Sequence, residues 1–256
     1  MHILLTNDDG INAPGLQALE EIARALNPKR ITIVAPEYDQ SGVAHSLSLN
    51  DPLRLREIEP DRYAIKGTPT DCVIMAIYKI FDGARPDLVL SGVNRGHNVA
   101  EDVTYSGTVA GAMEGAILGV PSFALSQSYA SGDRESVPWE TAVAHAPRVI
   151  RRLLDEGVSP NTLININFPN CTPDEIAGVA VCVQGKRDAA LLKIEERRDG
   201  RNMPYFWIGF QKQRSTPRPG SDLAALAERR IAVTPLRVDL TDTVALTRYA
   251  AALDRS

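Results

Sequence analysis

Cysteine is scarce in this sequence: Cys72, Cys171 and Cys182 are the only three among 256 residues. Their odd number and wide, irregular spacing do not suggest a disulfide framework and fit a reducing compartment. We interpret all three as small buried core thiols. The sequence therefore predicts a cytoplasmic protein that is held together by its core.

Long hydrophobic runs are also missing. The longest stretch of low charge, residues 107–125, contains Glu114, Pro121 and four glycines, which is not how a membrane span is built. The first residues have no basic head and an apolar run of only three residues, so we expect no signal peptide. Nothing in these segments favours an association with membranes.

An excess of positive charge is absent as well, because the formal net charge is −4. This excludes a nucleic-acid duplex bound through bulk positive charge. A polyanionic ligand would have to be held locally, by a metal ion or by backbone amides. Hydrophobic residues make up 44% and charged residues 23%, which is ordinary for a globular domain.

The first 125 residues alternate short apolar runs with helical patterns, which favours an α/β fold. Such strands belong to a mostly parallel sheet with helices on both faces, where ligands bind outside the carboxyl ends of the strands. The expected strands cover residues 3–5, 31–35, 88–90 and 122–125, and the expected helices cover about 14–26, 68–81 and 107–118.

The pattern loosens after residue 125. Residues 184–220 are rich in Arg, Lys, Gly and Pro, which predicts an extended arm or hairpin of the kind that packs on a neighbouring subunit. We therefore divide the chain into a core (1–183), this arm, and a returning strand with a C-terminal helix (221–256). Beyond residue 125 the expected helices cover about 136–154 and the residues from 242, and the expected strands cover 163–168, 204–209 and 231–234.

Two acidic residues, Asp8 and Asp9, directly follow the first expected strand. Neighbouring strand residues point to opposite faces, so both carboxylates converge only if the chain turns, which Asn7 and Gly10 favour. Carboxylates brought together either take up a proton or share a cation. Oxygen ligands suit Mg²⁺ or Mn²⁺. The alternative is that Asp-Gly is only a turn.

Two further strand ends offer neutral oxygen ligands. Ser41 lies in the polar loop after the second expected strand, and Asn94 follows the third. Each residue type is common in loops without any ligand. Their shared position at strand ends nevertheless predicts a partial shell of Asp8, Asp9, Ser41 and Asn94 for one hard cation.

The expected helix near residue 107 begins with Ser106, Gly107 and Thr108. A helix N-terminus presents free amides and partial positive charge, which suits a phosphate, and the two hydroxyls would add donors. Simple capping by Ser106 is the alternative.

Other polar residues are harder to assign. His45 and His97 lie in polar loops and are either solvated or in contact with a substrate, and no histidine has zinc-ligand spacing. Arg187 belongs to a basic turn that is either solvated or near a phosphate. The aromatic residues 205–207 fit core or subunit packing better than base stacking.

At this point the sequence resembles the SurE survival-protein family of nucleotidases. The order and spacing of the matching segments run through nearly the whole chain. These segments are LLTNDDGI at 4–11, VAP at 34–36, QSG at 40–42, GTPTDCV at 67–73, DLVLSGVNRGHN at 87–98, YSGTV at 105–109, NINFP at 165–169 and VTPL at 233–236.

The resemblance implies a Rossmann-like three-layer αβα core with a protruding arm, used to form a homodimer or homotetramer. It implies hydrolysis of nucleoside 5′- and 3′-monophosphates, and trimming of short polyphosphate in some members. One divalent metal ion per subunit would be held by Asp8, Asp9, Ser41 and Asn94. The phosphate-binding positions would be Asn98, Ser106, Gly107 and Thr108.

Two catalytic routes remain open, with Asp8 and Asp9 as the catalytic residues. A water activated by the metal attacks phosphorus while one of the two carboxylates accepts its proton, or Asp8 attacks and forms an aspartyl-phosphate. A nucleotide- or metal-sensing module on the same fold is the alternative from another class, because every ligand named above would serve binding equally well.

Overall fold

The structure is a computed structural model that describes residues 1–130, 136–187, 192–210 and 216–254. The strands are β1 (His2–Thr6), β2 (Arg30–Pro36), β3 (Leu55–Glu59), β4 (Arg62–Ile65), β5 (Leu88–Arg95), β6 (Ser122–Gln127), β7 (Thr162–Phe168), β8 (Val179–Val181), β9 (Leu192–Arg198), β10 (Pro204–Phe210) and β11 (Ile231–Arg237). The α-helices are α1 (Pro14–Ala25), α2 (Pro69–Met75), α3 (Gly107–Ile117), α4 (Trp139–Glu156), α5 (Asp222–Ala227) and α6 (Thr243–Leu253).

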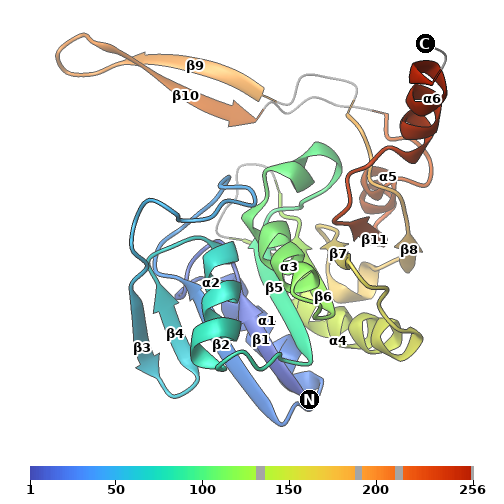
Figure 1. Ribbon diagram of the computed structural model, residues 1–256. Coiled ribbons are helices and arrows are strands. Elements are labelled where there is room, and N and C mark those ends of the chain that lie inside the picture. Colours follow the sequence, from blue (N-terminus) through green and yellow to red (C-terminus); the bar gives the residue numbers. More distant parts are fainter. Residues whose placement is uncertain (131–135, 188–191, 211–215, 255–256) are drawn as a thin grey trace.

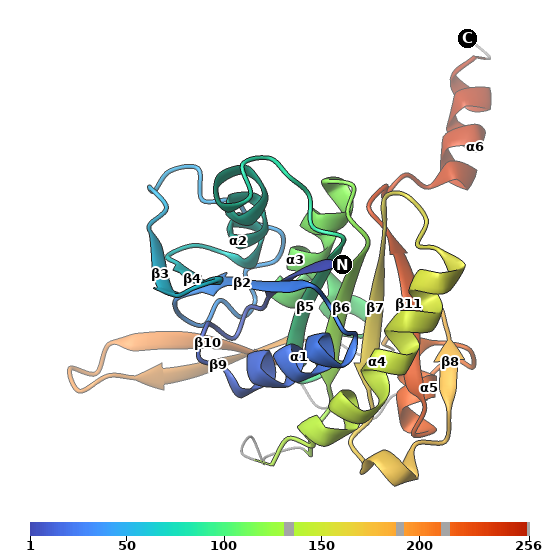
Figure 2. The same cartoon turned by 90° about the horizontal axis from the view of Figure 1, so that it is seen from below.

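The centre of the molecule is a mixed sheet with helices on both faces (Figures 1 and 2). Within the described ranges it has nine strands in the order β3-β4-β2-β1-β5-β6-β7-β11-β8. The strands from β4 to β7 in this order are parallel, whereas β3 and β11 run antiparallel to β4 and β7. The α/β class with a mostly parallel sheet, predicted from the sequence, is confirmed.

Both faces of the sheet are apolar, because its central strands are covered on both sides. Ile3 and Leu5 of β1 belong to the hydrophobic cluster under α1 and α4, while Leu4 belongs to the cluster under α2. All three side chains are fully buried. This is why the first strand is a continuous apolar run instead of an alternating one.

The start of α2 follows the sequence prediction. The backbone N–H of Thr68 donates to Asp71 Oδ2 at 2.8 Å, and the N–H of Asp71 donates to Thr68 Oγ1 at 3.2 Å. Pro69 occupies the first helical position. The α-helix ends at Met75, and a π-helical turn, Ala76–Ile80, completes the predicted segment.

The expected end of the third strand at residue 90 is wrong. Strand β5 continues to Arg95, because Asn94 and Arg95 resume pairing with Ser126 and Gln127 of β6 after an irregularity in the register. No strand was predicted for β3, β4 or β8, which lie in the outer part of the sheet.

Two elements stand away from the body. The antiparallel pair β9–β10 forms a long hairpin that projects from the core in both views, and α6 projects near the C-terminus (Figures 1 and 2). The predicted arm is described only over residues 184–187, 192–210 and 216–220, and its other residues lie outside the described part. In the described ranges, no helix has the length and apolarity needed to cross a bilayer.

Candidate active site

The site lies where the strand order of the sheet reverses. Strand β1 has β2 on one side and β5 on the other. The chain continues from β1 through α1 to β2 in one direction, and from β5 through α3 to β6 in the other. In a sheet of this kind a crevice opens at the carboxyl ends of the two central strands. Asp8 and Asp9 follow β1 at this position, and Asn94 is at the end of β5.

A tight turn directs the two acidic residues. The Asn7 side chain donates from Nδ2 to the carbonyl oxygen of Gly10 at 2.9 Å, and Gly10 has a φ of +101°. L-residues with a side chain rarely adopt this backbone conformation, so the turn requires glycine. The turn that the sequence predicted after β1 is therefore present.

Asp8 is buried against the first turn of α3. Thr108 Oγ1 donates to Asp8 Oδ1 at 2.6 Å. A Cβ added to Gly107 would lie only 2.7 Å from the Asp8 Cβ, so the two residues are in close contact. Burial, followed by the charge of Asp9, raises the pKa of Asp8 from 3.8 to about 7, although the hydrogen bond from Thr108 opposes this.

The side chains of the other predicted ligands form hydrogen bonds of their own. Asp9 Oδ2 accepts a hydrogen bond from the backbone N–H of Arg95 at 3.2 Å, which directs it toward the end of β5. Asn94 donates from Nδ2 to the Gly96 carbonyl at 2.8 Å, so Oδ1 is the atom through which Asn94 could bind a cation. The Ser41 hydroxyl donates to Asp39 Oδ1 at 2.6 Å.

The donor set suits a hard cation. Two carboxylates, an amide oxygen and a hydroxyl are all oxygen ligands, as Mg²⁺ and Mn²⁺ prefer. The raised pKa of Asp8 indicates unbalanced negative charge that a cation would offset. Among the described residues, no group of three His, Cys, Asp or Glu side chains could hold a metal ion. Of the four predicted ligands, only Asp8 and Asp9 are of these residue types.

Asn98 is held by polar residues of β6 and β7. Its backbone N–H donates to Asn167 Oδ1 at 2.7 Å, and its carbonyl accepts from Asn165 Nδ2 at 2.8 Å and Asn167 Nδ2 at 3.1 Å. Its side-chain Nδ2 donates to Ser126 Oγ at 2.9 Å. The Asn98 backbone and side chain are therefore fixed before any ligand arrives.

A shallow cavity of about 290 Å³ opens beside Asp9. It lies between the loops that follow β1 and β2, next to the end of β5. It is lined by Asp9, Gly10, Ile11, Asn12, Ala13, Glu37, Tyr38, Asp39 and Arg95. Its size and position suit the organic part of a ligand whose charged end lies at the carboxylates.

Comparison with known proteins identifies the family. The profile of the family described as Survival protein SurE matches residues 3–190. The chain belongs to the SurE family. It is 62% identical over 252 residues to the 5′-nucleotidase SurE of Methylorubrum populi, covering 98% of this chain and 99% of that protein. It is 63% identical to the 5′-nucleotidase SurE of Methylobacterium sp. over 253 residues, covering 99% and 100%.

A solved SurE structure has the same fold. The crystal structure of the SurE protein from Aquifex aeolicus superposes with a TM-score of 0.84 at 39% identity, covering 97% of this chain and 98% of that one. Together with the family profile, this confirms the SurE resemblance that the sequence motifs predicted.

Several sequence interpretations for this SurE protein change in the structure. The Ser106 oxygen accepts from the Val109 N–H at 3.1 Å and so caps α3, which leaves the Ser106 hydroxyl proton free to donate. Thr108 instead donates its hydroxyl proton to Asp8, so this proton is not directed at a ligand. His45 is an exposed loop residue, but it is also paired, because its Nε2 lies 2.9 Å from Glu114 Oε2. Arg187 is not a solvated turn residue, because Glu101 and Asp102 hold it.

Sequence reasoning missed the residues that support the site. Asp39 receives the Ser41 hydroxyl, and its charge also raises the pKa of Asp8. Asn165 and Asn167 hold Asn98. A signal for the two asparagines was available: they alternate with isoleucine in a buried strand, which places two polar side chains on one face of β7.

Proposed function

We propose that this chain hydrolyses nucleoside monophosphates to a nucleoside and inorganic phosphate, with one divalent metal ion per subunit. The relatives that match over nearly their whole length are 5′-nucleotidases, so the enzyme class is phosphoric monoester hydrolase. One observation supports the site most directly. The Asp8 carboxylate lies against the first turn of α3, which puts ligands for a cation beside amides for a phosphate.

Asp8, Asp9, Ser41 and Asn94 would hold the metal ion, with Mg²⁺ or Mn²⁺ as the expected ion. When bound, the ion supplies Lewis-acid chemistry toward a phosphoryl oxygen and toward water. The Ser41 hydroxyl now donates to Asp39. A small rotation of this exposed side chain would turn its oxygen lone pairs toward the carboxylates.

The tip of α3 would bind the phosphate. The first amides of a helix have no acceptor within it, and that of Val109 is already capped by Ser106. The Gly107 and Thr108 amides therefore have no acceptor inside the helix, and a Cβ at position 107 would occupy the space beside Asp8. With the fixed Asn98 amide, these donors stabilise charge that builds on the phosphoryl oxygens during the reaction.

Asp8 and Asp9 would carry the proton transfer. Either carboxylate could accept the proton of the attacking water. Attack by Asp8 itself is the second route. Single turnover in heavy-oxygen water separates the two: direct attack by water labels phosphate at once, whereas the covalent route labels Asp8 first.

The nucleoside would lie in the cavity beside Asp9, with Tyr38 as its aromatic contact. This side chain lines the cavity and is 67% exposed, so a base can stack on it. The Tyr38→Ala variant should raise KM for AMP about tenfold and leave KM for p-nitrophenyl phosphate unchanged. Equal changes for both substrates would place the base elsewhere.

The projecting elements would make the protein a homodimer or homotetramer. None of the residues of α6 is buried, and an isolated helix of this length is marginal in water. Tyr205, Phe206 and Trp207 of the hairpin are also exposed. A second copy of the chain would cover these apolar surfaces. Trimming of short polyphosphate would use the same phosphate site, and the cytoplasmic location remains a prediction.

A matrix of substrates and metals tests the proposed function. Phosphate release from 5′- and 3′-nucleotides and from short polyphosphate is measured with Mg²⁺, with Mn²⁺, and after chelation. We expect release from 5′-nucleotides that chelation stops and added metal restores. Nucleotide binding without release across the whole panel would instead favour a sensor module.

A further inference from the structure

The segment that carries Asn98 to the start of α3 has an unusual backbone. Val99 and Ala100 are fully buried, and Ala100 has a φ of +53°, a left-handed conformation that alanine rarely adopts. Buried backbone groups need hydrogen-bond partners. For residues 99–102, many of these partners come from a distant part of the chain.

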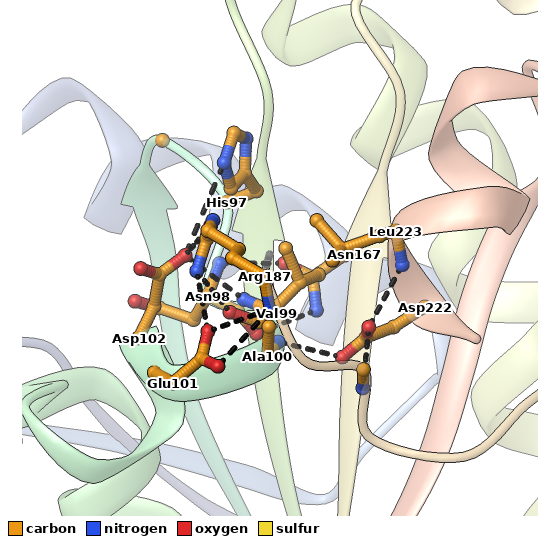
Figure 3. Close-up of polar contacts among 12 residues, drawn as sticks. His97, Asn98, Val99, Ala100, Glu101, Asp102, Asn167, Arg187, Asp222 and Leu223 are labelled. Atoms are coloured by element: carbon orange, nitrogen blue, oxygen red, sulfur yellow. Dashed lines mark hydrogen bonds and ion pairs between the residues drawn. The ribbon is translucent and has the colours of Figure 1, made fainter. Parts of the chain in front are cut away.

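Arg187, just before the hairpin, supplies one set of partners. Its guanidinium donates to the Val99 carbonyl at 3.3 Å from Nη1 and to Asp102 Oδ2 at 2.6 Å from Nη2. Its backbone N–H donates to Glu101 Oε1 at 3.0 Å. Figure 3 shows that these bonds converge on one short stretch, and the Arg187 side chain is only 17% exposed.

Asp222, just after the hairpin, supplies the second set. Its Oδ2 accepts from the Ala100 N–H at 2.9 Å, and its Oδ1 accepts from the Gly185 N–H at 2.9 Å. Asp222 is fully buried. Gln184 Nε2 donates to the Ala100 carbonyl at 2.8 Å, so both backbone groups of Ala100 are bonded to side chains distant in the sequence.

We propose that Arg187 and Asp222 are positioning residues for the phosphate site. They hold the backbone of residues 99–102 and thereby fix Asn98 on one side and the first turn of α3 on the other. These bonds of Arg187 and Asp222 run to residues 99–102 and to Gly185. We therefore expect the clamp to act on phosphate binding more than on the metal ligands. This inference rests on the proposed function for its choice of substrate.

The geometry also gives the clamp a second consequence. Arg187 lies five residues before β9, and Asp222 lies on the returning chain after β10. Gln184, Arg187 and Asp222 are thus joined by hydrogen bonds to residues 99–102. A displacement of these three residues would be transmitted to Asn98.

The test compares Arg187→Met with Arg201→Met, a change at the exposed turn of the hairpin. For Arg187→Met we expect KM for AMP and the inhibition constant of inorganic phosphate to rise about tenfold, because acidic partners are left unpaired and the segment relaxes. The Mn²⁺ concentration that gives half-maximal activity should stay the same. Arg187→Lys should recover part of the lost phosphate affinity. Lysine keeps the charge but cannot donate two hydrogen bonds in the fixed planar geometry of a guanidinium. Arg201→Met should match the parent protein.

A second variant keeps the proposal testable if Arg187→Met does not fold. Asp222→Asn keeps the shape of the side chain but replaces one acceptor oxygen with a donor, and it should raise the same two constants. Unchanged constants in both variants, or a higher Mn²⁺ requirement with an unchanged KM, would overturn the proposal.

A third measurement separates this inference from the proposed function. Calorimetric titration of the whole protein with inorganic phosphate does not depend on turnover. If the parent protein releases no phosphate from any nucleotide, the proposed function fails. Weaker phosphate binding in Arg187→Met than in Arg201→Met would then still support the clamp, and equal binding would overturn it.

Discussion

At the scale of single residues, Asp8 carries an electrostatic conflict. Its side chain is almost fully buried, a second carboxylate follows it in the chain, and one hydroxyl donates to it. The result is a pKa of about 7. A group whose pKa is raised in the folded state favours folding when it is protonated and opposes it when it is charged. Without metal, the protein should therefore lose stability as the pH rises from about 4 to about 7.

The Asp8→Asn variant tests this conflict. Asparagine keeps an oxygen that can accept from Thr108 and removes the buried charge. Without metal at pH 8 the variant should melt at a higher temperature than the parent protein, with a gain of about 4 kcal/mol as the upper bound. Turnover should fall by at least about 10³-fold. The measurements are thermal unfolding with chelator at several pH values, and phosphate release.

Asp51→Asn is the matched control for that experiment. Asp51 is an exposed carboxylate, so its loss should change metal-free stability little. If Asp8→Asn melted below the parent protein at pH 8 in chelator, the buried carboxylate would have to be well compensated, and our electrostatic interpretation would be wrong.

Gly107 is the second critical single residue. A Cβ there would meet Asp8 Cβ at 2.7 Å and Asp8 Oδ2 at 3.1 Å. Alanine normally stabilises a helix relative to glycine, but Gly107→Ala should lower the melting temperature and reduce activity about 10²-fold, because Asp8 is displaced. Gly200→Ala, where the added Cβ meets nothing within 4 Å, should leave both unchanged. An active, stable Gly107→Ala protein would contradict the close contact.

At the scale of elements, the loop after β2 is bonded to α3 and to the residues just before it. His45 Nε2 lies 2.9 Å from Glu114 Oε2, and the Ala44 N–H donates to the Tyr105 carbonyl at 3.2 Å. The same loop carries Ser41 and Asp39. The position of the Ser41 hydroxyl therefore depends on a contact made by a helix far away in the sequence.

His45→Ala should loosen this loop. We expect a loss of about 1 kcal/mol in stability and a several-fold higher Mn²⁺ requirement, with a smaller effect on KM for AMP, because the tie is to the Ser41 loop. Denaturant unfolding and a metal titration of activity measure these effects. His145→Ala, which removes a histidine that contacts only a carbonyl near α4, serves as the control. If His45→Ala and His145→Ala needed the same Mn²⁺ concentration, the loop that carries Ser41 would have no role in metal binding.

At the scale of the whole molecule, the exposed apolar surface is concentrated on the parts that project. The hairpin exposes Phe206, Trp207 and Ile208, and α6 exposes Val244 and Leu253. An apolar surface of this kind on a projecting element usually marks an interface. The hairpin also connects through Arg187 and Asp222 to the phosphate-binding segment, so assembly and substrate binding would share one structural unit.

Trp207→Asp tests the role of the hairpin in assembly. It should shift the sedimentation coefficient toward that of a smaller species at micromolar concentration, because a charge replaces an aromatic anchor. Tyr78 is an aromatic residue outside the hairpin and α6, and it is 62% exposed. The Tyr78→Asp variant should not change the sedimentation coefficient. Identical sedimentation of both variants and the parent protein would remove the hairpin from the interface.

The sequence alone determined the local features of this protein. The apolar runs of β1, β2 and β6, the capping box of α2 and the Asn7–Gly10 turn follow from neighbouring residues, and so does the position of Asp8 and Asp9 at a strand end. Periodicity and turn chemistry act over a few residues, and for that reason they can be read without a structure.

Only the tertiary structure decided which distant residues meet. Asp8 and Thr108 are 100 residues apart, Asn98 and Asn167 are 69 apart, and Ala100 and Asp222 are 122 apart. These pairings depend on the order and register of the strands, which cannot be read from any short stretch of sequence. The same physics explains why Arg187 resembled a solvated turn: its acidic partners come close only after the sheet has brought the hairpin base beside the start of α3.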